Sequence, residues 1–233
     1  MKILKAKSLS FVAILGLALM STMVLPQAMA ATYWWDAGQA FTNTSASELS
    51  SFANVPAEPT GLAKSDITGL WIGGWSQSSS ILNQPEIRPV GSNYWAGYLE
   101  VYNGTSDADA ESTVITNVQL SPTDTVRYDV YLSSGSSCQT VKNASTGATA
   151  THCFSAHNYG TTFSSADATL EGHEWTSSDY TSMDGTITFT TFNQYVSGVS
   201  SSPSFSTTTV NSPPNCMGGS GGSGTVSLTL NGC

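Results

Sequence analysis

Alternation of apolar and polar side chains is clearest in "YWAGYLEVY", residues 94–102. Trp95, Gly97, Leu99 and Val101 fall on one side of this period-two pattern, and tyrosines, Ala96 and Glu100 fall on the other. Such a pattern predicts a β-strand with one face in a hydrophobic core. The second face combines aromatic rings with a carboxylate, which is typical of a binding surface. A solvated outer face with scattered tyrosines is the alternative.

Other segments repeat this pattern. The strand-like stretches are "TVRYDVYL", with Val126, Tyr128, Val130 and Leu132 on one side, and "TVSLTL", with Val226, Leu228 and Leu230 on one side. "TITFTTF" follows Asp184-Gly185, a pair that favours a hairpin turn. A short helix is expected only in "SASELSSF" (45–52), and loops in the serine- and glycine-rich stretch 197–224. Many short strands with frequent turns predict an all-β fold, an antiparallel β-sandwich of the jelly-roll or concanavalin-like kind.

The first thirty residues do not fit this pattern. Three lysines precede the apolar run "FVAILGLALMSTMVL", and "AMA" supplies the small residues of a cleavage site after Ala30. This arrangement predicts a secretory signal peptide over 1–30, with a retained N-terminal anchor as the alternative. Residues 31–233 then form a single β-sandwich domain, secreted and extracellular, without a membrane partner after signal removal. We expect this domain to be a monomer.

Charge narrows the choice of partner. Removal of the signal leaves four basic side chains against sixteen acidic ones, a net charge of −12. Nucleic acid is therefore excluded as a partner, because almost nothing basic remains to neutralise phosphates. Because charged side chains of either sign are scarce, the folded protein has few ion pairs that acid could break by protonation. This composition suits an acidic medium.

All four cysteines lie in the predicted mature domain, and an even number in a secreted chain indicates disulfides. If Ala144–Gly147 is a turn, Cys138 and Cys153 lie six residues from it on either side and face each other across a hairpin. Cys216 and Cys233 are then the remaining pair, although the alternative pairings stay open. No CxxC or HxxxH spacing is present, and His152, His157 and His173 lack metal-site spacing, so we expect neither a metal nor another cofactor.

Several segments together resemble, in order along residues 68–192, the glutamic peptidases, the eqolisin family of acid-acting secreted endopeptidases. They are "LWIGGW" (70–75), "ILNQPEI" (81–87), "YLEVY" (98–102), "VKNASTGATATHCFS" (141–155) and "HEW" (173–175). They are similar, respectively, to the family's Trp-Val-Gly-Ile-Asp-Gly, Ile-Leu-Gln-Thr-Gly-Val, Trp-Tyr-Glu-Trp-Tyr, Asn-x-Thr-Thr-Gly and Ala-Glu-Trp segments. The chain is identified as a divergent, prokaryote-type secreted member.

The resemblance implies a catalytic dyad of Gln84 and Glu174. The glutamine segment is altered, because alignment on Ile87 selects Gln84 whereas alignment on Ile81-Leu82 selects Asn83, and Gln77 is a distant third candidate. Trp75 stands where the family has an aspartate. The family's substrate groove implies four further residues that contact an unfolded or extended polypeptide substrate: Trp71, Tyr98, Glu100 and Tyr102.

A glutamine and a glutamate can hydrolyse a peptide bond in acid. A glutamate with an unperturbed pKa of about 4.3 can act as base for water and then as acid for the leaving amine. Packing beside Trp175 would raise the pKa of Glu174 further. A glutamine amide donates hydrogen bonds to an oxyanion at any pH.

Two other functions remain compatible with a β-sandwich. One is a glycoside hydrolase that uses Glu100 and Glu174 as its two carboxylates, with tyrosines stacked on sugar rings. The other is a non-catalytic carbohydrate-binding module, in which Glu174 would be dispensable.

Overall fold

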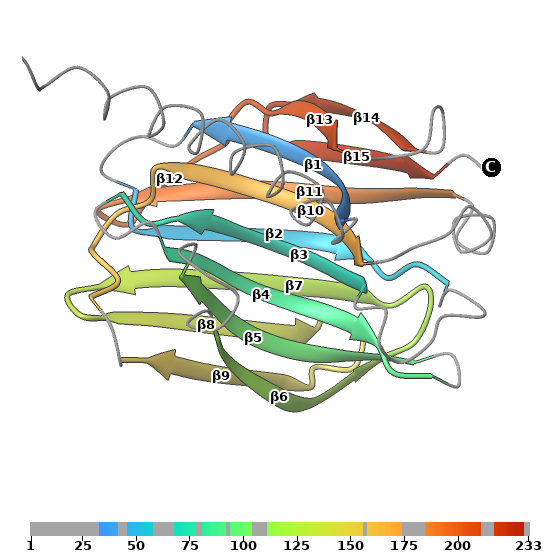
Figure 1. Cartoon of the computed structure of the whole chain (residues 1–233), viewed down its shortest axis with the longest axis horizontal. Helices are drawn as coiled ribbons and strands as arrows, with labels where there is room; N and C mark the ends of the chain where they lie inside the picture. Colours follow the sequence, from blue (N-terminus) through green and yellow to red (C-terminus); the bar gives the residue numbers. More distant parts are fainter. Residues whose placement is uncertain are drawn as a thin grey trace, which may run out of the picture. The chain divides into compact units, whose positions relative to one another are not determined.

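The computed structural model describes residues 33–41, 46–57, 68–77, 81–91, 94–103, 111–155, 158–173, 185–210 and 217–230. These residues form two antiparallel sheets that pack as a sandwich (Figure 1). The seven-stranded sheet runs, in spatial order, β13 (Ser206–Val210), β1 (Tyr33–Phe41), β10 (Ser165–His173), β3 (Thr68–Trp75), β4 (Ile81–Pro89), β5 (Trp95–Asn103) and β6 (Glu111–Leu120). The predicted all-β sandwich is confirmed.

The eight-stranded sheet packs against it. Its order is β14 (Met217–Gly222), β15 (Thr225–Leu230), β11 (Gly185–Val196), β2 (Glu48–Asn54), β7 (Thr125–Ser133), β8 (Ser136–Asn143) and β9 (Thr149–Phe154), with β12 (Val199–Ser201) paired to β11. Among the described residues no helix is long and apolar enough to cross a membrane.

The core lies between the sheets, and the alternating strands supply it as predicted. Each face that was expected to be apolar is buried: Trp95, Leu99 and Val101 on β5; Val126, Tyr128, Val130 and Leu132 on β7; Val226 and Leu228 on β15. Two polar contacts also join the sheets. The Tyr128 hydroxyl donates to the Leu70 carbonyl at 2.7 Å, and burial raises the pKa of this phenol well above its usual value.

The second contact holds the middle of β5. Gln139 on β8 accepts a hydrogen bond from the Glu100 backbone N–H at 2.9 Å and donates to the Glu100 carbonyl at 2.6 Å. Both ends of this fully buried amide are thus used on one residue of the opposite sheet. These two hydrogen bonds therefore hold the Glu100 backbone in place independently of the contacts of its side chain.

Two local predictions are wrong. Residues 48–52 are part of strand β2 and not of a helix, because tertiary pairing with β7 and β11 outweighs a weak helical pattern. The stretch 197–224 contains β12, β13 and β14 instead of loops alone. Asp184 lies outside the described residues, so the hairpin turn expected at Asp184-Gly185 stays a prediction.

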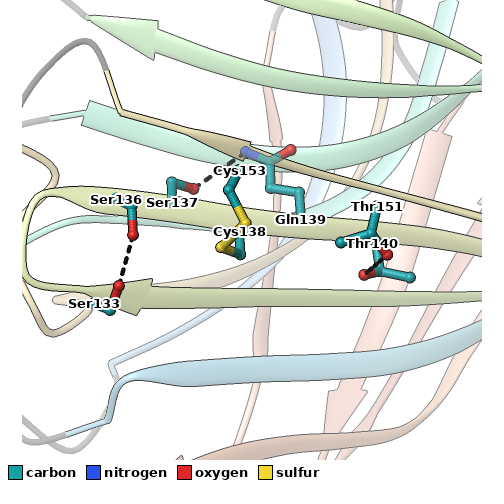
Figure 2. Close-up of a disulfide and its surroundings, with 8 residues drawn as sticks. All are labelled: Ser133, Ser136, Ser137, Cys138, Gln139, Thr140, Thr151 and Cys153. Carbon is teal, nitrogen blue, oxygen red and sulfur yellow. Dashed lines mark hydrogen bonds between the residues drawn. A yellow bond between two sulfur atoms is a disulfide. The ribbon is translucent and has the colours of Figure 1, made fainter.

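The Cys138–Cys153 disulfide is confirmed and joins directly opposite residues of β8 and β9 (Figure 2). Beside it, Thr140 and Thr151 share a hydrogen bond at 2.8 Å between their hydroxyls. The described residues do not include Cys216 or Cys233, so the second predicted disulfide stays a prediction.

Candidate active site

The antiparallel pair β4–β5 places the candidate glutamine directly opposite a carboxylate. Gln84 pairs with Glu100, and Ile87 and Leu99 on the same strands point into the core. Strand alternation therefore puts Gln84 and Glu100 on the face of the sheet turned away from the core. Both are nevertheless buried, with 4% and 6% of their surface exposed.

Gln84 and Glu100 are hydrogen-bonded to each other. Gln84 Nε2 donates to Glu100 Oε1 at 3.0 Å, and Thr113 donates to Glu100 Oε2 at 3.2 Å. An ionised carboxylate only accepts hydrogen bonds, so it selects the amide orientation with nitrogen toward Glu100. Gln84 retains a second N–H, and its Oε1 is buried without a hydrogen-bond partner among the described residues.

A buried charge network continues from Glu100. Arg88 Nη2 contacts both Glu100 and Glu86, and the Arg88 guanidinium lies 4.9 Å from the centre of the Tyr98 ring. Glu86 is only 1% exposed. Burial raises the pKa of the Glu86 carboxyl, the Arg88 charge and hydrogen bond oppose this, and Glu171 adds to it. The site therefore holds several acidic groups around one cation.

Strand β3 adds two tryptophans to this face. Trp71 pairs with Glu86 in register and is buried, and its indole N–H donates to Glu171 Oε2 at 3.0 Å. Trp75 meets Tyr102 edge-on, with ring centroids 6.4 Å apart. The structure thus brings together on one face the sequence candidates Gln84, Trp71, Tyr98, Glu100 and Tyr102.

The two alternative amides lie elsewhere. Asn83 is fully buried and its Nδ2 donates to the carbonyls of Ile81 at 3.0 Å and Gly74 at 3.3 Å. Gln77 is exposed at the end of β3, where its side chain accepts a hydrogen bond from Thr162 at 2.9 Å. Of the three amides, only Gln84 lies beside a carboxylate on the outer face.

The predicted Glu174 falls outside the described residues, just after the end of β10. A different acid on β10 was overlooked in the sequence. Asp167 is 4% exposed, pairs with Gly73 of β3, and accepts a hydrogen bond from Ser165 at 2.8 Å. The signal was the alternation in "SADATLEGH", where Asp167, Thr169 and Glu171 alternate with buried apolar residues.

No group of three or more His, Cys, Asp or Glu side chains that could hold a metal ion occurs in the described part of the chain. The site consists instead of an amide, carboxylates, a guanidinium and aromatic rings. These groups can donate to an oxyanion, exchange protons and contact an extended chain.

Solved structures of glutamic peptidases share this fold. Scytalido-glutamic peptidase, solved with a peptide-based transition state analogue, superposes with a TM-score of 0.62 at 18% identity, over 87% of this chain and 100% of that one. SCP-B, described as a member of the eqolisin family in complex with the tripeptide Ala-Ile-His, gives 0.60 at 17% identity over the same shares. Aspergilloglutamic peptidase from Aspergillus niger gives 0.52 at 19% identity, over 71% of this chain and 99% of that one.

At these identities the likeness establishes the eqolisin-type β-sandwich fold. No protein-family model and no curated protein matches the sequence.

Proposed function

We propose that this protein is a secreted, acid-acting endopeptidase that cleaves unfolded or extended polypeptides. The observation that carries the proposal is the Gln84 amide, which is buried and hydrogen-bonded through Nε2 to Glu100. Its second N–H and its Oε1 remain for a reacting group. A donor held in place before the reaction stabilises a developing oxyanion without having to reorganise.

The fold and the neighbouring side chains support a peptide substrate. The solved glutamic peptidases with this fold include complexes with a peptide-based transition state analogue and with a tripeptide. Trp71, Tyr98 and Tyr102 on the same face would contact the substrate chain. On the sequence resemblance, Glu174 would be the carboxylate that activates water and protonates the leaving amine.

The remaining expectations follow from this role. Residues 1–30 would be removed as a signal peptide, leaving a secreted monomer of residues 31–233 that stays free of membranes and nucleic acid. The Cys138–Cys153 bridge supports an oxidising destination, because disulfides persist in extracellular compartments. A second bridge between Cys216 and Cys233 would fit the same compartment.

A glycoside hydrolase that uses Glu100 with Glu174 is less well supported. Such an enzyme needs one of its carboxyls protonated as a general acid. Its mechanism gives no role to the Gln84 amide, which is buried and hydrogen-bonded to Glu100.

The direct test is an assay of the purified mature protein on an unfolded protein substrate from pH 2 to 7, with pepstatin present throughout. We expect cleavage only in acid. Absence of cleavage at every pH, from protein whose near-ultraviolet circular dichroism shows native packing, would overturn the proposal. Binding to polysaccharide, measured in parallel, would then favour the carbohydrate-binding alternative.

A further inference from the structure

The row of side chains that contains Gln84 also contains a carboxylate on β10. Asp167 pairs with Gly73 of β3. Trp71 pairs with Glu86 and Gly74 pairs with Asn83, and this constant register places Gly73 level with Gln84. One line across the sheet therefore reads Asp167, Gly73, Gln84, Glu100.

Gly73 lies between Asp167 and Gln84 in this row and has no side chain. Neighbouring strands lie about 4.8 Å apart, so the backbones of Asp167 and Gln84 are about 10 Å apart with β3 between them. Gly73 contributes no side chain to the face between them. A Cβ there would lie 2.4 Å from the Asn83 carbonyl oxygen, so no larger residue fits without a backbone shift. In this row no other side chain therefore separates Asp167 from Gln84.

Of the other acids of this face, Glu86 and Glu171 lie in other rows of the sheet, and Glu100 is already hydrogen-bonded to Gln84. Glu100 is held by Gln84, Thr113 and Arg88; Glu86 contacts Arg88; Glu171 accepts the Trp71 indole N–H. Asp167 accepts a hydrogen bond from Ser165 two residues away. Among these four acids, only Asp167 lies across Gly73 from Gln84.

The position of Glu174 along the chain weighs against it. A strand advances about 3.4 Å per residue, so β10 at His173 has already travelled about 20 Å from the level of Asp167 and Gln84. In addition, Ala166, Ala168 and Leu170 face the core. Odd-numbered residues of β10 therefore share the face of Gln84, and Asp167 is the one at its level.

The second observation is the unpaired acceptor on Gln84. Its Oε1 is buried and lacks a hydrogen-bond partner among the described residues. Thr169, two residues after Asp167 on the same face, also has a buried Oγ1 without a hydrogen-bond partner in the described part of the chain. A buried acceptor in this position costs free energy unless something binds it, and a water molecule satisfies that need.

We infer that Asp167, rather than Glu174, is the carboxylate that works with Gln84 on a water molecule held over Gly73. The inference rests on the proposed peptidase function. Asp167 takes a proton from the water molecule while the water oxygen forms a bond to the peptide carbonyl carbon. The electron pair of the carbonyl double bond moves to the carbonyl oxygen, and the resulting oxyanion accepts a hydrogen bond from the second Gln84 N–H. Protonated Asp167 then gives that proton to the amide nitrogen, the C–N bond breaks, and the products are a carboxylic acid and an amine.

The test compares Asp167→Asn with Glu174→Gln, both isosteric changes, in the acid cleavage assay. We expect Asp167→Asn to lower kcat/KM by about 100-fold or more, the usual contribution of an acid–base group, and to lower it further than Glu174→Gln does. Circular dichroism and melting temperature establish that each variant is folded.

Two further variants keep the test decisive if Asp167→Asn fails to fold. Asp167→Glu should retain measurable cleavage with its pH profile moved upward by about 0.4 unit, the difference between the unperturbed carboxyls. Ser165→Ala should also move the profile upward, because it removes a hydrogen bond that favours the ionised form of Asp167. A purely structural Asp167 would move neither profile.

The outcomes separate the two proposals. If the wild-type protein cleaves and folded Asp167→Asn keeps more than a tenth of that activity, or neither pH profile moves, the assignment of Asp167 is overturned while the peptidase stands. If the wild-type protein does not cleave at any pH, the peptidase fails and the assignment fails with it.

Discussion

The two sheets differ sharply on the faces they turn away from the core. On the seven-stranded sheet this face buries Gln84, Glu86 and Glu100. On the eight-stranded sheet the matching face carries partly or fully exposed Ser and Thr, the disulfide, and the Arg127–Asp129 pair, whose Arg127 side chain is 41% exposed. Burial of polar groups costs free energy, whereas an exposed ion pair is worth about 1 kcal/mol at most. The outer face of the seven-stranded sheet retains its buried polar groups despite this cost, so it is the better candidate for a catalytic site.

Glutamates on the two faces sharpen this contrast. Burial is the main cause that raises the pKa of both Glu86 and Glu48. Arg88 and Arg127, respectively, oppose that rise. Glu48 is half-buried, so water screens its interactions, whereas Glu86 has almost no access to solvent. The same residue type is therefore a surface charge on one sheet and a buried acid on the other.

Substitution of Gln84 should separate the two faces most strongly. Gln84→Ala removes the proposed oxyanion donor, and we expect kcat/KM to fall by about 10²–10³-fold. Thr140→Ala on the opposite sheet is the control, with unchanged activity and a stability change within about 0.5 kcal/mol. Cleavage by Gln84→Ala at near wild-type rates would contradict the contrast between the faces.

Loss of the disulfide should affect stability without affecting activity. The Cys138→Ser, Cys153→Ser double variant opens a loop with a sequence separation of 15 residues, for which we expect a loss of about 3 kcal/mol in the free energy of unfolding. Denaturant titration measures this loss, and kcat/KM at a temperature well below melting should stay at the wild-type value. A fall in kcat/KM would instead show that β8, through Gln139, transmits changes to Glu100.

Gly73→Ala tests the tight packing of the active face. The added Cβ would lie 2.4 Å from the Asn83 carbonyl oxygen, so we expect a loss of about 1–3 kcal/mol in stability together with reduced cleavage. Gly218→Ala is the matched control, because a Cβ there meets nothing within 4 Å. Equal melting temperatures for the two variants would argue against close packing at Gly73.

Glu86→Gln should change how stability depends on pH. Since the folded pKa of Glu86 is raised from 4.5, its protonated form is favoured in the native state. The stability contributed by the protonated Glu86 carboxyl is fully present below pH 4.5 and is lost as pH rises through the folded pKa. The variant should therefore lose less stability than the wild type between pH 4 and pH 7, measured as melting temperature. Glu48→Gln should show a smaller change of the same sign, and an unchanged wild-type slope in Glu86→Gln would contradict the raised pKa.

Local patterns predicted the two faces of one strand and one disulfide correctly. The alternation in residues 94–102 separates Trp95, Leu99 and Val101 from the face of Tyr98 and Glu100, as the structure confirms. Symmetry about a turn likewise predicted the Cys138–Cys153 bridge. Both inferences use only neighbours along one strand or one hairpin, so the information lies within a short stretch of chain.

Long-range register is where sequence reasoning was insufficient. The local motif "HEW" pointed to Glu174. Asp167 lies in the row of Gln84 because β10 and β4 both pair with β3, and this pairing is not visible in the local sequence. The short helix predicted over 45–52 was wrong for a related reason, since pairing of β2 with β7 and β11 outweighs local preference.

Local sequence patterns are sufficient to predict the all-β class, the two faces of the clearest strands, one disulfide and the candidate glutamine. Tertiary structure alone decided which acids lie beside that glutamine, because a one-residue change of register moves a side chain to the opposite face and no local pattern specifies the partner strand. It also decided that Glu86 and Glu100 are buried around Arg88, since burial depends on what packs across the sheet.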